Sequence, residues 1–316
     1  PQDPSLWRAL AGGITTIQVL PGSANLIGGK SFVAKLKPAV SARLMRFPGA
    51  PLGLKMACGE NPKRVYKDKG GPSTRMGNVA GYKSQLQKAH EKLYAQKKYQ
   101  AKLADWQNKK AQAGDDPKKI KEAGPPPDAP GLDHGVATLV ELLEGKIQAH
   151  IHCYRADEMS IMLDLAEQYG FTIKSFHHGL EAYKIKERLA ASKVTVSTWA
   201  DWWGFKMEAF DGISQNIVLL EQAGALPLVH SDSEKDIRIL GKEAAKAAAA
   251  GYSLGIPPDE ATMLKWVTLN PAIAMGIDGQ VGTLEAGKHA DIVLWDGSPF
   301  SVYAKADVVL IDGEVV

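Results

Sequence analysis

The sequence predicts an α/β protein, a (β/α)8 barrel of parallel strands followed by a small C-terminal β-sandwich portion. From residue 134 to residue 250, short apolar strands alternate with helical stretches, which is the pattern of βαβ units. Four such units in succession, after at least two earlier strands, favour a barrel over a doubly wound sheet. With 316 residues, 45% of them hydrophobic and 23% charged, the chain has the composition of a globular protein with a large core.

Two strands are expected before the repeating units. A short helix is expected at 5–12, and residues 14–20 are rich in β-branched side chains, which favours a buried strand. Residues 21–29 are expected to form a loop, because their Pro and Gly residues fit turns and match no phosphate-binding motif. A second strand is expected at 53–58.

Residues 83–130 are expected to be a helical insertion in the barrel. A helix is predicted at 82–106, with one thin apolar stripe, and Pro-rich and Gly-rich linkers follow it. Residues 83–121 contain eleven Lys and only four acidic residues, although the whole chain has a net charge of only +3. The basic character therefore belongs to this segment and not to a nucleic-acid-binding body. The segment is either a solvated surface helix or a contact for a partner or an anionic surface.

The regular part of the chain gives the remaining elements. Helices are expected at 135–145, 156–169, 180–191, 213–223, 234–250 and 258–267, and strands at 147–152, 171–176, 193–199 and 226–230. Residues 281–316 contain short strands separated by turns. The domain prediction is therefore a barrel over 1–280 and a small β portion over 281–316.

Histidines gather where three of the expected strands end. Five of the eight His and one Asp lie there, namely His150, His152, His177, His178, His230 and Asp232. Because parallel barrel strands end at one rim, these side chains are expected to lie close together. Neutral imidazoles with a carboxylate are suitable ligands for a divalent metal such as zinc, which lowers the pKa of bound water.

Several segments resemble the amidohydrolase superfamily. Residues 268–277 and 282–300 are similar to its closing signature, and Ala11-Gly-Gly-Ile-Thr-Thr16 resembles its second barrel strand. His152-Cys-Tyr-Arg and Phe176-His-His-Gly resemble its strand-five and strand-six metal motifs, most closely those of the imidazolonepropionase and Xaa-Pro dipeptidase branch, and His230-Ser-Asp resembles its strand-eight motif. The resemblance implies a metal-dependent hydrolase of C–N bonds in cyclic or peptide-like amides.

The resemblance also implies roles for single residues. His152 and His178 correspond to metal ligands, and Asp232 to a ligand that also acts as general base. The fourth strand of the family supplies a carboxylated Lys or a Glu, and both Lys55 and Glu60 are available. Lys55 is preferred because it lies within the expected strand; the alternative is a buried structural lysine.

The family's first strand ends in a metal-binding His-x-His pair, and no counterpart precedes Ala11 in this sequence. We therefore expect either an N-terminally incomplete chain that lacks the first barrel strand, or an incomplete metal site. The alternative function is a catalytically incomplete barrel that acts as a binding protein through its Lys-rich helix.

Substrate-binding candidates surround the expected metal site. Tyr154 and Arg155 follow His152, Trp202 follows another strand, and His230 could contact the substrate or orient a ligand. Arg155 could bind a substrate carboxylate or form a structural salt bridge, and the tryptophans could line a pocket or pack the barrel against a helix.

The expected partner is a small molecule, not a nucleic acid, and no apolar run is long enough for a membrane span. A homo-oligomer is left open. The compartment, cytoplasmic or exported, is not predicted.

Overall fold

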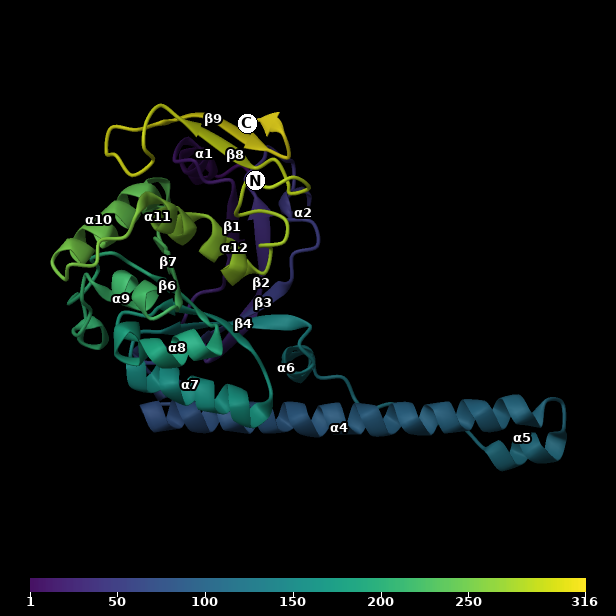
Figure 1. Cartoon of the computed structure of the whole chain (residues 1–316). Helices are drawn as coiled ribbons and strands as arrows, with labels where there is room; N and C mark the ends of the chain where they lie inside the picture. The colour runs from purple at the N-terminus through teal and green to yellow at the C-terminus, as the bar shows by residue number, and fades with distance from the viewer.

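The computed structural model describes residues 1–316, and its main sheet contains seven strands in chain order. The five strands β3 (Leu52–Ala57), β4 (Ile147–Cys153), β5 (Ile173–His178), β6 (Thr195–Thr198) and β7 (Leu226–Val229) are parallel to one another. The predicted α/β class with a parallel sheet is confirmed. The sheet curls but does not close, because β1 (Thr16–Val19) and β7 are its two edges (Figure 1).

The first part of the sheet differs from the prediction. β2 (Ile27–Lys35) pairs antiparallel with both β1 and β3, and its first residues lie in the segment that was expected to be a loop. Gly28 and Gly29 obscured this strand, because glycine is uncommon in strand interiors. In the structure a Cβ on Gly28 would lie 3.3 Å from the carbonyl oxygen of Lys55. Gly28 therefore allows a close approach of β2 to β3, where the register also shifts.

Helices connect the parallel strands or follow the last of them, β7, and they cover the sheet. They are α6 (His134–Leu143), α7 (Ala156–Tyr169), α8 (Lys186–Ser192), α9 (Asn216–Gln222), α10 (Leu240–Tyr252), α11 (Glu260–Val267) and α12 (Leu269–Met275). Each expected helix is present, although two begin with a 3-10 turn, and α12 was not predicted as a separate element. The main core lies between these helices and the sheet, with Ile151 and Phe176 fully buried.

A small C-terminal sheet packs beside the open end, as expected for residues 281–316. β8 (Ile292–Trp295), β9 (Ala306–Ile311) and β10 (Glu314–Val315) form an antiparallel sheet next to α1 (Pro4–Ala11) (Figure 1). Lys35, at the end of β2, is fully buried and forms ion pairs with Asp291 at 2.8 Å and with Asp312. These ion pairs connect the small sheet to the main one.

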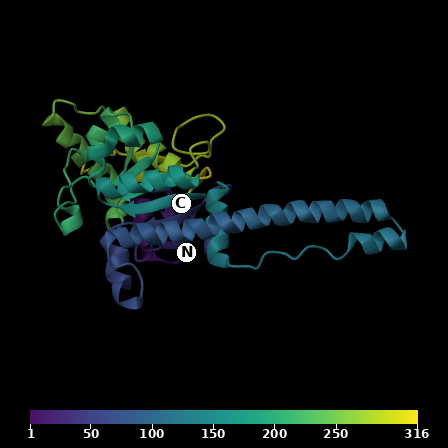
Figure 2. The same cartoon turned by 90° about the horizontal axis from the view of Figure 1, so that it is seen from below.

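The Lys-rich segment forms a long helical arm. Two short helices, α2 (Ala42–Met45) and α3 (Glu60–Tyr66), precede α4 (Arg75–Ala113), which extends far beyond the body, and α5 (Pro117–Ala123) lies at its far end (Figures 1 and 2). Tyr82 and Leu86, near the start of α4, are buried in the main core. The helix is longer than the predicted 82–106, and its first turns belong to the body. No helix of the structure combines the length and apolarity that a membrane span requires.

Candidate active site

The histidines at the carboxyl ends of β4, β5 and β7 form two layers. In the inner layer, the side-chain amide nitrogen of Gln18 donates to Nε2 of His150 at 3.1 Å. Because Nε2 of His150 accepts this bond, its Nδ1 carries the proton and donates to Nε2 of His177, also at 3.1 Å. Burial lowers the pKa of His150 to about 3, so the ring is neutral. This inner layer is held by protein partners.

The outer layer consists of His152, His178 and His230, and each of these rings has a nitrogen that lacks a partner. The ring centroids of His152 and His178 are 4.5 Å apart, and those of His178 and His230 are 5.0 Å apart. Nδ1 of His152, Nδ1 of His178 and Nε2 of His230 are buried without a hydrogen-bond partner. Buried polar atoms are normally paired, so three unpaired nitrogens on neighbouring rings indicate a place for a ligand.

The outer histidines have the chemistry of metal ligands. Burial lowers the pKa of each ring, and the positive charge of Lys55 lowers it further, so all three are neutral imidazoles. Neutral imidazole nitrogen is a common zinc ligand. The donor set therefore fits a divalent transition metal, although no three His, Cys, Asp or Glu side chains are already arranged around one point in the structure.

Lys55 and Asp232 interact electrostatically. Burial lowers the pKa of Lys55 and raises the pKa of Asp232. The negative charge of Asp232 raises the pKa of Lys55, and the positive charge of Lys55 lowers that of Asp232, so each charge opposes the effect of burial on the other group. Glu60 does not line the cavity on which Lys55 and Asp232 lie, and its carboxylate is 3.3 Å from the ammonium of Lys206. Of the two lysine or glutamate candidates, Lys55 is the one whose charge acts on Asp232 and on the histidines.

The backbone is strained at two of the expected ligands. His178 has φ 76° and Asp232 has φ 52°, in the left-handed region that disfavours most side chains. The turn after His178 is fixed from outside, because Thr198 Oγ1 donates to the carbonyl of His178 at 2.8 Å and Asn216 Nδ2 donates to that of Gly179 at 3.0 Å. Strain that the surroundings maintain is typical of functional positions.

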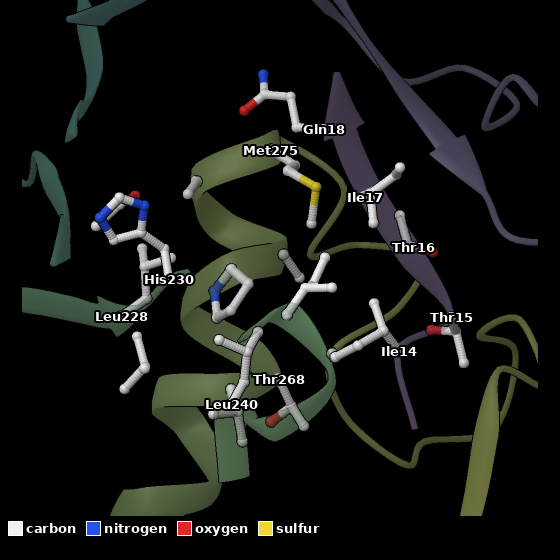
Figure 3. A pocket seen from close by; sticks show the side chains of 18 of the residues that line it. Ile14, Thr15, Thr16, Ile17, Gln18, Leu228, His230, Leu240, Thr268 and Met275 are labelled. Atoms are coloured by element: carbon white, nitrogen blue, oxygen red, sulfur yellow. The ribbon is translucent and has the colours of Figure 1, made fainter. Parts of the chain in front are cut away.

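A cavity of about 1140 Å³ reaches these residues from the open side of the sheet. In Figure 3, Thr16 and Gln18 of β1 line one side of it, Leu228 and His230 line the other, and Met275 of α12 lies between them. Its walls also include Lys55, His177, His178 and Asp232. The edges β1 and β7 are therefore separated by a space that leads directly to the histidines.

The substrate-binding candidates have different surroundings. Tyr154 is buried and stacks on His178, with ring centroids 5.1 Å apart and an interplanar angle of 15°. Arg155 donates to both carboxylate oxygens of Asp157, at 2.9 and 3.2 Å, which is the salt-bridge alternative. Trp202 stacks on Trp199 and does not line the cavity.

Three polar residues near the histidines were not predicted. Gln18 contacts the inner layer, Asn61 Nδ2 donates to Nε2 of His152 at 3.4 Å, and Asn216 holds the strained turn. Only Asn61 carried a signal in the sequence, because it follows the expected strand 53–58 in the segment Gly-Glu-Asn-Pro. Amides on a predicted strand or helix carry no such signal.

Comparisons with known proteins agree with this architecture. The sequence matches the model of the Amidohydrolase family over residues 8–316. Amidohydrolase tasK of Hapsidospora irregularis is 30% identical over 333 residues, which cover 99% of this chain and 31% of that protein. The chain thus spans about a third of the length of this relative.

Solved structures are also similar. An amidohydrolase from Thermotoga maritima MSB8 has a TM-score of 0.79 and 33% identity, and the match covers 100% of this chain and 75% of that one. An adenosine deaminase from Xanthomonas campestris with bound zinc has a TM-score of 0.44 and 21% identity, over 57% of this chain and 47% of that one.

Proposed function

Because the chain belongs to the amidohydrolase family, we propose that it hydrolyses a carbon–nitrogen bond in a cyclic or peptide-like amide, with a divalent metal, zinc, as cofactor. The observation that carries the proposal is the outer histidine layer. Three buried, neutral imidazoles each keep an unpartnered nitrogen, and two of them, His178 and His230, line a cavity together with Lys55 and Asp232.

His152, His178 and Asp232 are the proposed metal ligands, together with Lys55 as a carboxylated lysine. Glu60 is the weaker alternative because Lys206 already neutralises it. When bound, a divalent metal would lower the pKa of water and polarise the amide carbonyl. The strained turns at His178 and Asp232 fix their positions before the substrate arrives.

Asp232 is the proposed general base. Its pKa is raised by burial, which makes the carboxylate a better proton acceptor. It takes a proton from the attacking water and transfers it to the leaving nitrogen. Tyr154 and His230 face the site and are proposed to contact the substrate, whereas Arg155 must leave Asp157 to do so.

We also propose that the cavity between β1 and β7 receives one further strand, which carries the His-x-His pair of the family and closes the barrel over 1–280. Both facing edges are free of pairing, and the hydroxyl of Thr16, on the cavity wall, is buried without a partner. On this proposal, 83–130 is an insertion and 281–316 is a separate β portion.

The test is to express the 316-residue chain and a form extended upstream by the encoding gene, with Asp232→Asn in each as control. We expect metal content and turnover on hydantoin-like rings and dipeptides to rise together in the extended form. Full metal occupancy and high turnover in the 316-residue form would overturn the added strand. If neither form binds metal and neither form turns over substrate, the proposed hydrolase activity is overturned, and the alternative function as a binding protein is favoured.

A further inference from the structure

A continuous stack of aromatic rings extends outward from the site. The rings of His178 and Trp199 are 4.7 Å apart at 21°, and those of Trp199 and Trp202 are 5.3 Å apart at 15°. Phe205 stands nearly perpendicular to Trp199, with centroids 6.1 Å apart. We call Tyr154, Trp199, Trp202 and Phe205 the aromatic shelf; the last three belong to the segment that follows β6.

Exposure changes sharply along the shelf. Tyr154 and Trp199 are buried, whereas Trp202 is 42% and Phe205 is 53% exposed. The outer rings therefore present apolar surface to solvent and contact the buried rings of Trp199 and Tyr154. Contiguous exposed apolar surface on a soluble protein is typical of a site that binds a ligand or a partner.

The shelf is fixed by polar contacts on both sides. Trp199 Nε1 donates to the carbonyl of Ser231 at 2.9 Å, next to Asp232. Beyond Phe205, the ammonium of Lys206 lies 4.1 Å from the centre of the Tyr154 ring and 3.0 Å from the buried carboxylate of Glu208. Glu208 in turn accepts from the backbone N–H of Glu60 at 2.9 Å. A segment held in this way keeps its exposed rings in one orientation, which lowers the entropic cost of binding.

We propose that Trp202 and Phe205 determine specificity by binding a flat, aromatic side group of the amide substrate. This inference rests on the proposed function, since it places the scissile amide near His178. A flat ring is the occupant that the stack favours, because a ring laid on Trp202 would continue the series of stacked rings that begins at His178 and passes through Trp199. Offset stacking of aromatic rings contributes beyond the area that it buries.

A second copy of the chain is the competing occupant. Trp203, Met207 and Phe210 are also exposed in the same segment, and a dimer interface would cover them together with Trp202. The two possibilities lead to different expectations. A substrate subsite would make the monomer discriminate between small amides, whereas a dimer interface would double the mass of the particle.

The experiment measures binding, not turnover. N-acetyl-phenylalaninamide and N-acetyl-alaninamide are titrated into the purified 316-residue protein, and dissociation constants are obtained by ligand-observed NMR. The phenylalanine compound is expected to bind about fivefold more tightly, and Trp202→Ala and Phe205→Ala are each expected to reduce this preference. Trp202→Tyr keeps a flat ring and should preserve most of it. Trp7→Ala, which removes an exposed tryptophan on α1, is the matched control and should change nothing.

Equal binding of the two amides, or an unchanged preference in folded Trp202→Ala, would overturn the subsite. A particle of twice the monomer mass by sedimentation equilibrium that Trp202→Ala converts to monomer would also overturn it, in favour of the second copy. A retained preference without hydrolysis in the extended form would contradict the proposed reaction and leave the shelf intact as a binding site, so the two failures are distinguishable.

Discussion

The two histidine layers use the same side chain for different purposes. His150 and His152 lie two residues apart on β4 and therefore point to the same face of the sheet. His150 has a protein partner on each ring nitrogen, whereas His152 keeps Nδ1 unpartnered although both rings are buried. Burial alone thus does not distinguish a structural histidine from a candidate ligand. The two are distinguished by whether each ring nitrogen has a hydrogen-bond partner. The inner layer is expected to maintain the fold, and the outer layer to carry the chemistry.

The largest expected effect is on catalysis. Asp232→Asn should lower kcat of the active form by about 10²–10⁴-fold, because the amide cannot accept the proton. Asparagine also tolerates the left-handed backbone at this position, so circular dichroism and unfolding should be unchanged. Activity within a factor of ten of the wild type would show that another group is the base.

His178→Asn should remove metal without removing the fold. It deletes an outer imidazole while it keeps a residue that adopts φ near 76°. Zinc affinity is expected to fall by at least tenfold, measured by competition with a chelator, because one ligand is lost. Wild-type affinity in this variant would exclude His178 from the ligand set.

His150→Ala should have the opposite profile. It leaves His177 and Gln18 without their partner and opens a cavity in the inner layer, which is expected to lower the free energy of unfolding by about 3 kcal/mol. Urea denaturation measures this loss. If the variant instead lost metal and kept its stability, the two layers would have been assigned the wrong way round.

Gln18→Ala is the mildest variant. It removes one donor to His150 and leaves the bond between His150 and His177 in place. The expected loss is about 1 kcal/mol in the free energy of unfolding, with unchanged metal affinity. A loss as large as that of His150→Ala would mean that Gln18 holds the edge strand β1 and not only the ring.

Much of the site could be predicted because strand ends are visible in a sequence. Apolar runs that end in His150-Ile-His152, His177-His178 and His230-Ser-Asp232 define one rim once the sheet is parallel. The antiparallel β2 was missed because Gly28 and Gly29 imitate a loop. For Trp202 the sequence leaves open whether the side chain lines a pocket or packs the barrel against a helix. The order in which the aromatic rings stack depends on the path of the loop after β6, which the sequence does not predict.

The two layers themselves could not be predicted. Whether a histidine nitrogen finds a partner depends on residues far away in the chain, such as Gln18 for His150. The strained turn at His178 is held by Thr198 and Asn216, and no local pattern in the sequence encodes such contacts. The two layers therefore differ only in the hydrogen-bond partners that the folded chain brings to each ring.

The arm α4 has a consequence for how the particle moves in solution. Its 39 residues form a rod of about 58 Å; the first half packs on the body through residues such as Tyr82, Leu86, Ala89 and Leu93, and the remainder projects away from it (Figure 1). Such a projection raises the frictional coefficient of the 34.0 kDa chain and slows its tumbling. A monomer should therefore elute early from a sizing column, at the volume of a larger compact protein, and only an equilibrium mass measurement reports its true subunit number.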